Sequence, residues 1–150
     1  MKYDLVRFLR AACPFLLAIG LWRLSVPFWN PGGVLAIIVV FYCSFVKHVP
    51  WFGAFSVLMC MLVDYKFETV CFWLVMYCLF YSVNGFQNFI DISRMEYDGL
   101  PAFAFFCGVS IIALFFMNIS FINVFRGIWM FLWMCALYIP IVQLIKKVQQ

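Results

Sequence analysis

Val34-Leu35-Ala36-Ile37-Ile38-Val39-Val40 is apolar at every position, and this stretch decides the fold class. A strand of a lipid-facing β-barrel alternates apolar and polar side chains, so the run does not fit such a strand. A helix satisfies its own backbone hydrogen bonds, which makes it the default structure inside a lipid bilayer. The stretch therefore predicts a helix in a membrane protein.

The composition of the whole chain leads to the same class. Of the 150 residues, 68% are apolar and only 11% are charged, whereas about 25% of residues are charged in a typical soluble domain. The residues that are not apolar are too few to cover the surface of a water-soluble fold of this size. We therefore expect a single integral membrane domain over residues 1–150, with its outer surface facing lipid.

Charged and turn-forming residues divide the chain into six apolar segments. We expect an all-α polytopic bundle of about six transmembrane helices, the first of them uncleaved. Crossing a hydrocarbon core takes ~20 helical residues, with a usable range of roughly 17 to 25, so the second and third segments are short. Arg126 is expected to close the fifth. The segments are 11–28, 34–46, 51–63, 69–83, 100–125 and 127–145.

The basic residues predict the orientation of the bundle, because cytoplasmic loops carry an excess of Lys and Arg. With the N-terminus inside, the outside receives only Lys66 and Arg126, with Arg23 near its edge. We therefore expect both termini in the cytoplasm. The cations are scattered at helix ends, so nucleic-acid binding is not indicated. The inside receives Lys2, Arg7, Arg10, Lys47, Arg94, Lys146 and Lys147.

Enzymatic and cofactor-binding motifs are missing from the sequence. The lone histidine, His48, lies at an expected helix end, where a solvated loop position is its ordinary role. No GxSxG elbow, Gly-rich phosphate loop or HExxH pattern occurs. The seven cysteines lie in apolar runs without a CxxC pair, which favours small apolar packing roles. We expect no catalytic residue, no metal and no cofactor.

Asp64 is the first candidate for a functional site. It ends an apolar run, and Lys66 and Glu68 follow it closely. One interpretation is an acid in interfacial water, paired with Lys66 at little energetic gain. The other is a carboxylate aimed into the bundle, because ionisable groups at membrane depth are costly and tend to mark function. A pairing of Asp64 with Arg23 at the outer interface is a further hypothesis.

The most polar stretch that touches an expected helix runs from Asn84 to Asp91. At helical spacing Asn84, Asn88 and Asp91 share one face, and Gln87 borders it. One interpretation is a cytoplasmic loop with its helix cap. The other is a polar face that binds a partner or a ligand headgroup, and the sequence leaves both open.

Several segments of the chain resemble the bacterial rod shape-determining protein MreD family, whose members are inner-membrane partners in the cell-wall elongation complex. They show a Tyr late in one helix, a short turn containing Pro, a helix with small residues and an Asp that closes it. Pro140 inside the last helix, with Lys146-Lys147 after it, is also similar. The matching stretches are Val26-Pro27-Phe28-Trp29, Phe41-Tyr42, Val49-Pro50-Trp51-Phe52-Gly53-Ala54-Phe55, Leu62-Val63-Asp64 and Trp133 to Val148.

The resemblance implies a non-enzymatic scaffold of the bacterial inner membrane that contacts lipids and an MreC-like single-span partner, with Tyr42 among its contact residues. MreD-like proteins also resemble the substrate-binding components of vitamin transporters. A second hypothesis is therefore a small-molecule binder with a mid-depth cavity lined by Asp64, Asn84, Gln87 and Asn88. A third, a lipid-modifying enzyme, has only Asp91, Arg94 and Asp98 as candidates.

Overall fold

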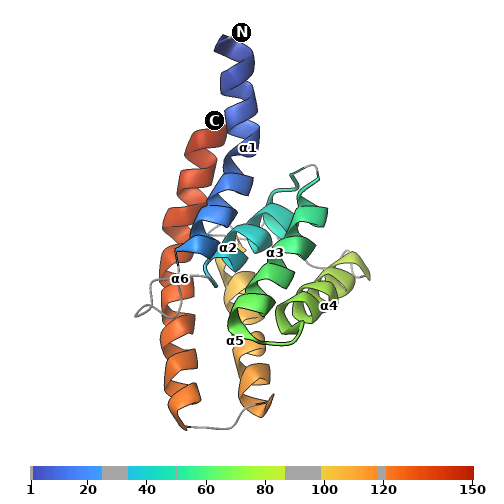
Figure 1. The fold of residues 1–150 in the computed structure, drawn as a ribbon, viewed down its shortest axis with the longest axis vertical. Helices are drawn as coiled ribbons and strands as arrows, with labels where there is room; N and C mark the ends of the chain where they lie inside the picture. Colours follow the sequence, from blue (N-terminus) through green and yellow to red (C-terminus); the bar gives the residue numbers. More distant parts are fainter. Residues whose placement is uncertain (1, 25–33, 50, 87–98, 118–120) are drawn as a thin grey trace.

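The computed structural model describes residues 2–24, 34–49, 51–86, 99–117 and 121–150. Within these ranges the structure is all-helical and contains no strand, as the sequence predicts (Figure 1). A π-helical turn, η1, continues the short helix α2. The elements are α1 (Lys2–Arg23), α2 (Ala36–Phe41), η1 (Tyr42–Val46), α3 (Phe52–Phe67), α4 (Phe72–Phe86), α5 (Leu100–Met117) and α6 (Phe121–Gln149).

Three helical segments in the described part of the chain are long and apolar enough to cross a membrane: Tyr3–Arg23, Leu100–Met117 and Val124–Gln149. Two further segments, Ala36–Val46 and Phe72–Val83, are apolar but shorter. Each of the six segments expected from the sequence thus contains a helix. Length and composition support a membrane crossing for three of them.

The boundary between α5 and α6 differs from the sequence prediction. The sequence predicts a fifth helix from Leu100 to Phe125 that Arg126 closes, but α5 ends at Met117 and α6 begins at Phe121. Arg126 lies inside α6 with an exposed side chain. A long arginine side chain reaches polar surroundings from a helix surface, so its charge does not require the helix to end.

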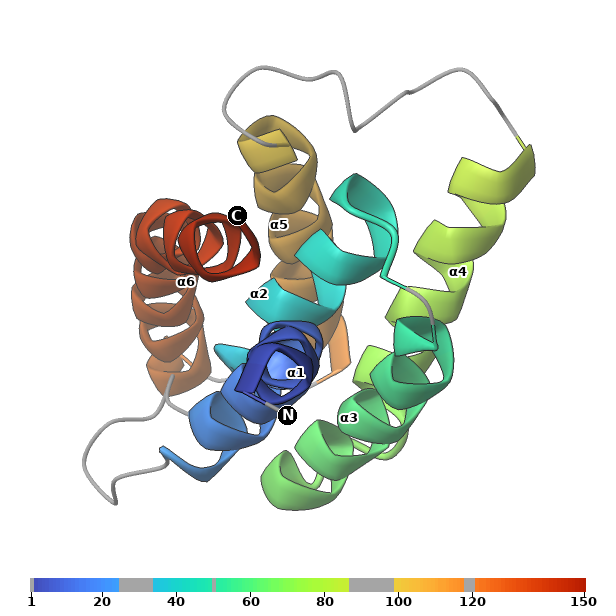
Figure 2. The same ribbon diagram turned by 90° about the horizontal axis from the view of Figure 1, so that it is seen from above.

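α2 occupies the centre of the bundle. Each residue from Val34 to Cys43 is at most 2% exposed, and α2 packs against α1, α3 and α6. Figure 2 shows the longer helices arranged around it. A helix that is apolar on all sides belongs in a core or in lipid. The stretch that decides the fold class is therefore the core of this bundle and not a lipid-facing surface.

Aromatic rings fill the space between α2 and its neighbours. The ring of Phe41 lies 5.1 Å from Phe45, 5.7 Å from Phe80, 5.3 Å from Phe103 and 5.6 Å from Phe106. These separations are in the range in which aromatic pairs attract each other beyond simple burial. Phe41 therefore joins α2 to η1, α4 and α5.

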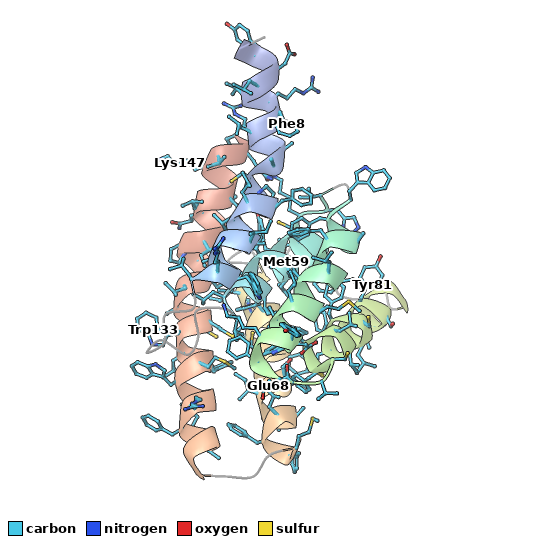
Figure 3. All side chains as sticks on the ribbon, in the orientation of Figure 1. Phe8, Met59, Glu68, Tyr81, Trp133 and Lys147 are labelled. Carbon is cyan, nitrogen blue, oxygen red and sulfur yellow. The ribbon has the colours of Figure 1, made fainter. Side chains whose placement is uncertain are left out.

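Both termini lie at the same end of the molecule (Figure 1). At this end Arg10 Nη1 of α1 donates a hydrogen bond of 3.2 Å to the backbone oxygen of Gln150. Figure 3 shows Lys147 near this end, Met59 midway, and Glu68 toward the other end. That both termini face the cytoplasm stays a prediction from the basic residues.

Candidate functional site

The Asp64 carboxylate holds the start of α4. Its Oδ1 accepts hydrogen bonds from Thr69 Oγ1 at 2.6 Å and from the Trp73 amide at 2.9 Å, and its Oδ2 accepts one from the Leu74 amide at 3.0 Å. The first amides of a helix lack partners within it, and the helix dipole favours an anion there. Asp64 is only 4% exposed. It is therefore a buried cap that α3 supplies to α4.

The connection between α3 and α4 needs this support. Its backbone is left-handed at Glu68, Val70 and Cys71, where φ is 55°, 42° and 58°. Such conformations cost about 1–3 kcal/mol each for residues other than glycine. The backbone oxygen of Asp64 also accepts a hydrogen bond of 3.1 Å from the Thr69 amide. The bonds to Asp64 thus offset strain in a tight helix reversal.

The two ion pairs considered for Asp64 do not form. All three bonds of its carboxylate go to residues 69–74, and the Arg23 side chain is exposed at the end of α1. Lys66 instead donates to the backbone oxygen of Trp22 and lies 4.9 Å from the centre of its indole ring. Trp22 Nε1 donates to the Leu62 carbonyl at 3.1 Å. These contacts fasten α1 to α3.

A second polar cluster joins η1, α3 and α4 inside the bundle. Tyr77 donates to Ser44 Oγ at 3.1 Å, the Ser44 and Ser56 hydroxyls lie 2.9 Å apart, and Ser56 donates to the Phe52 carbonyl at 2.8 Å. Because Ser56 donates to Phe52, Ser44 donates to Ser56. The three hydroxyls therefore form a directed chain that ends at a backbone carbonyl, and each is satisfied within the protein.

Replacing Tyr77 with phenylalanine tests how much this chain of hydroxyls stabilises the fold. We expect Tyr77→Phe to lower the free energy of unfolding in mixed micelles by about 0.6 kcal/mol, the mean for hydrogen bonds between membrane helices, and by at most about 1.7 kcal/mol. Tyr81→Phe is the matched control, because Tyr81 is on the same helix and is 51% exposed. Equal effects of the two variants would show that the Tyr77 hydroxyl adds nothing specific.

The other candidate residues fall into two groups. Tyr42 begins η1 with its side chain buried, 2% exposed, so it packs inside the bundle and offers no outer contact surface. Asn84 belongs to α4, but its side chain lies outside what the structure describes. Gln87, Asn88 and Asp91 lie outside the described residues. The polar face expected there remains a prediction from the sequence.

A cavity of about 300 Å³ lies where the α3–α4 connection meets α5 and α6. Thr69 and Arg126 are the polar side chains that line it, and Phe67, Trp73 and Phe115 contribute aromatic walls. Thr69 also bonds to Asp64, so the buried carboxylate lies behind one wall. The other lining residues are Val34, Ile111, Leu114, Gly127 and Met130.

Sequence reasoning missed the chain of hydroxyls formed by Ser44, Ser56 and Tyr77. The available signal is two isolated serines in otherwise apolar segments, a pattern that favours hydrogen bonds between helices in lipid. Among the residues that the structure describes, no three His, Cys, Asp or Glu side chains gather as a metal site would require.

Comparisons of the chain with family models, with curated proteins and with solved structures find no match. The fold itself defines the class. The described residues form an all-helical bundle in which three helices are long and apolar enough to cross a membrane.

Proposed function

We propose that this chain is a multi-pass protein of the bacterial inner membrane and an MreD-like, non-enzymatic scaffold. In this role it binds a single-span, MreC-like partner by contacts between helices and serves the machinery that sets cell shape. The observation that carries the proposal is an exposed apolar stripe along α3. Its residues are Ala54, Val57, Leu58, Met61 and Tyr65.

The geometry of α3 suits a partner helix. The stripe repeats at three- and four-residue intervals, as one face of a helix does. Neighbouring Gly53 is exposed and has open space where a Cβ would stand, and small residues let two helix backbones approach closely in a membrane. The 16 residues of α3 span only about 24 Å, less than the ~30 Å hydrocarbon core. A partner helix of about 20 residues beside α3 would cross the whole hydrocarbon core, which α3 alone is too short to do.

The opposite face of α3 is held rigidly. Phe52, Met59 and Val63 are fully buried in the core, and the contacts of Trp22 with Leu62 and Lys66 fix α3 to α1. A rigid surface loses little conformational entropy when a partner binds, which favours affinity. The stripe on α3 is therefore suited to selecting one helix.

The interior of the bundle favours a scaffold over a small-molecule binder. The buried hydroxyls and the Asp64 carboxylate are already hydrogen-bonded within the protein. The gap between α2, α4 and α5 that Phe41, Trp73 and Tyr77 help to line is too narrow for a water-sized sphere. These groups leave a substrate little to bind at mid-depth.

The small-molecule binder is the alternative, and the cavity beside Arg126 favours it. A guanidinium, a hydroxyl and three aromatic rings can hold a small anion with an apolar body. A low-molecular-weight compound that copurifies with the chain, and is lost in Arg126→Gln, would support this alternative.

Photo-crosslinking in cells tests the scaffold. A photoreactive residue at Leu58 is expected to give one discrete protein adduct, and mass spectrometry is expected to identify a protein with a single membrane span. Ile112 on α5 is the matched control, because it is 55% exposed and Leu58 is 52% exposed. Lipid adducts alone at both positions, or the same protein adducts at both, would contradict a partner site on α3.

A further inference from the structure

A second and larger cavity, of about 560 Å³, is lined by residues that include Gln149 at the end of α6. The C-terminus lies at the same end of the molecule as the N-terminus (Figure 1). Four parts of the chain build the cavity: α1, the segment that follows η1, the start of α3 and the end of α6. Its lining residues are Arg10, Ala11, Phe15, Lys47, His48, Val49, Trp51 and Gln149.

The polar side of this cavity is basic. Arg10, Lys47 and His48 line it, and no Asp or Glu does so among the described residues. Arg10 is held in place by its hydrogen bond to the Gln150 backbone oxygen, which leaves further guanidinium donors for a ligand. Two cationic side chains and an imidazole on one wall favour an anion with several oxygen atoms.

Gln149 supplies an independent sign of a ligand. Its side-chain oxygen Oε1 is buried, and no donor in the described part of the chain reaches it. A buried acceptor without a donor is costly, so such groups call for an explanation. A ligand that brings a hydroxyl or ammonium group beside its anionic group would satisfy this oxygen.

The remaining walls are apolar. Phe15 packs against Phe52 and Phe55, with ring centres 5.1 Å and 4.9 Å away. Trp51 is 87% exposed, and its backbone is left-handed with φ of 66°. A tryptophan that projects from strained backbone next to cations has the character of the aromatic residues that anchor proteins at the lipid headgroup level.

We propose that this cavity binds one anionic phospholipid, with its phosphate on Arg10 and Lys47 and a headgroup hydroxyl on Gln149 Oε1. The glycerol backbone then lies against Phe15 and Trp51. The acyl chains follow α1 toward Ile19, which stands one turn beyond Phe15 and is 44% exposed. The apolar half of the cavity distinguishes a lipid from free phosphate, which would leave Phe15 and Trp51 without a role.

Native mass spectrometry of the purified full chain tests this site, with phosphatidylglycerol and phosphatidylcholine supplied in equal amounts. We expect one phosphatidylglycerol to be retained in preference to phosphatidylcholine. Losing a charge-assisted hydrogen bond costs roughly tenfold or more in affinity, so the double variant Arg10→Gln/Lys47→Gln is expected to lose the bound lipid.

The matched control removes the same charge at the same end. Arg7→Gln/Lys147→Gln changes two exposed cations that do not line the cavity, and we expect it to keep the lipid. Lys47→Gln alone gives a second measure if the double variant does not fold, because the Lys47 side chain is exposed. Equal loss in both double variants, or equal retention of the two lipids, would overturn the proposal. The proposal would also be overturned if millimolar inorganic phosphate displaced the bound lipid as effectively as phosphatidylglycerol does.

Discussion

Replacing Asp64 with alanine is expected to lower the free energy of unfolding by about 3–5 kcal/mol. The change removes three hydrogen bonds to a carboxylate and leaves the Trp73 and Leu74 amides without acceptors. A hydrogen bond to a charged group contributes about 1.5–3 kcal/mol, and a buried donor left without a partner costs about 1–3 kcal/mol. These terms overlap, so their sum is an upper limit.

Two further variants separate the effect of the Asp64 carboxylate on stability from the effects of neighbouring groups. Asp64→Asn keeps the shape and one acceptor oxygen, so we expect a smaller loss of about 1–2 kcal/mol. Glu68→Gln removes an exposed carboxylate from the same helix reversal, and we expect a change within about 0.5 kcal/mol. Unfolding titrations in mixed micelles measure all three. A loss in Asp64→Ala no greater than in Glu68→Gln would show that the buried cap does not stabilise α4.

The sequence predicts the helical class well because one physical constraint dominates it. Long apolar segments with few charges have to satisfy their backbone hydrogen bonds internally. The expected segment 34–46 corresponds to α2 with η1, and 69–83 overlaps α4. Polar and turn-forming residues locate several boundaries, but α1 begins at Lys2 and not at Ala11, because Arg7 and Arg10 lie inside the helix. The prediction fails at Arg126, because a charge at a helix surface near a membrane interface is compatible with a continuing helix.

The sequence does not reveal which apolar residues face the core. In a water-soluble protein polar residues mark the outer face, but here both the lipid-facing and the buried surfaces are apolar. Phe105 is 67% exposed while Phe106 is 3% exposed, and the two are neighbours of the same type. The central position of α2 is hidden for the same reason. Only the packing of the helices decides it.

The candidate site was partly predictable. An acid at the end of an apolar helix already marks Asp64, and the structure supports the interpretation that it points inward. The sequence does not predict the hydrogen-bond partners of Asp64, because they depend on the left-handed backbone at Val70 and Cys71. A β-branched residue such as Val70 rarely adopts this conformation. The basic cavity was also hidden, since Arg10, Lys47 and Gln149 are far apart in the sequence.

Replacing Phe41 with alanine is expected to lower the free energy of unfolding by about 2–4 kcal/mol. The side chain is 1% exposed and packs against four other rings. Part of the usual 3–5 kcal/mol for a buried Phe→Ala change is transfer from water, and that part shrinks when the unfolded helices stay in lipid or detergent. The cavity and the lost ring contacts, at about 0.5–1.5 kcal/mol per aromatic pair, account for the remainder.

The decisive comparison is with Phe105→Ala, which deletes the same side chain from the exposed face of α5. Because Phe105 faces the surroundings of the protein, its loss leaves no internal cavity, and we expect a change within about 0.5 kcal/mol. The difference between the two variants measures whether α2 is enclosed. If both cost the same, then Phe41 faces lipid as Phe105 does. α2 would then be a peripheral helix, and the closed interior that favours a scaffold over a small-molecule binder would not exist.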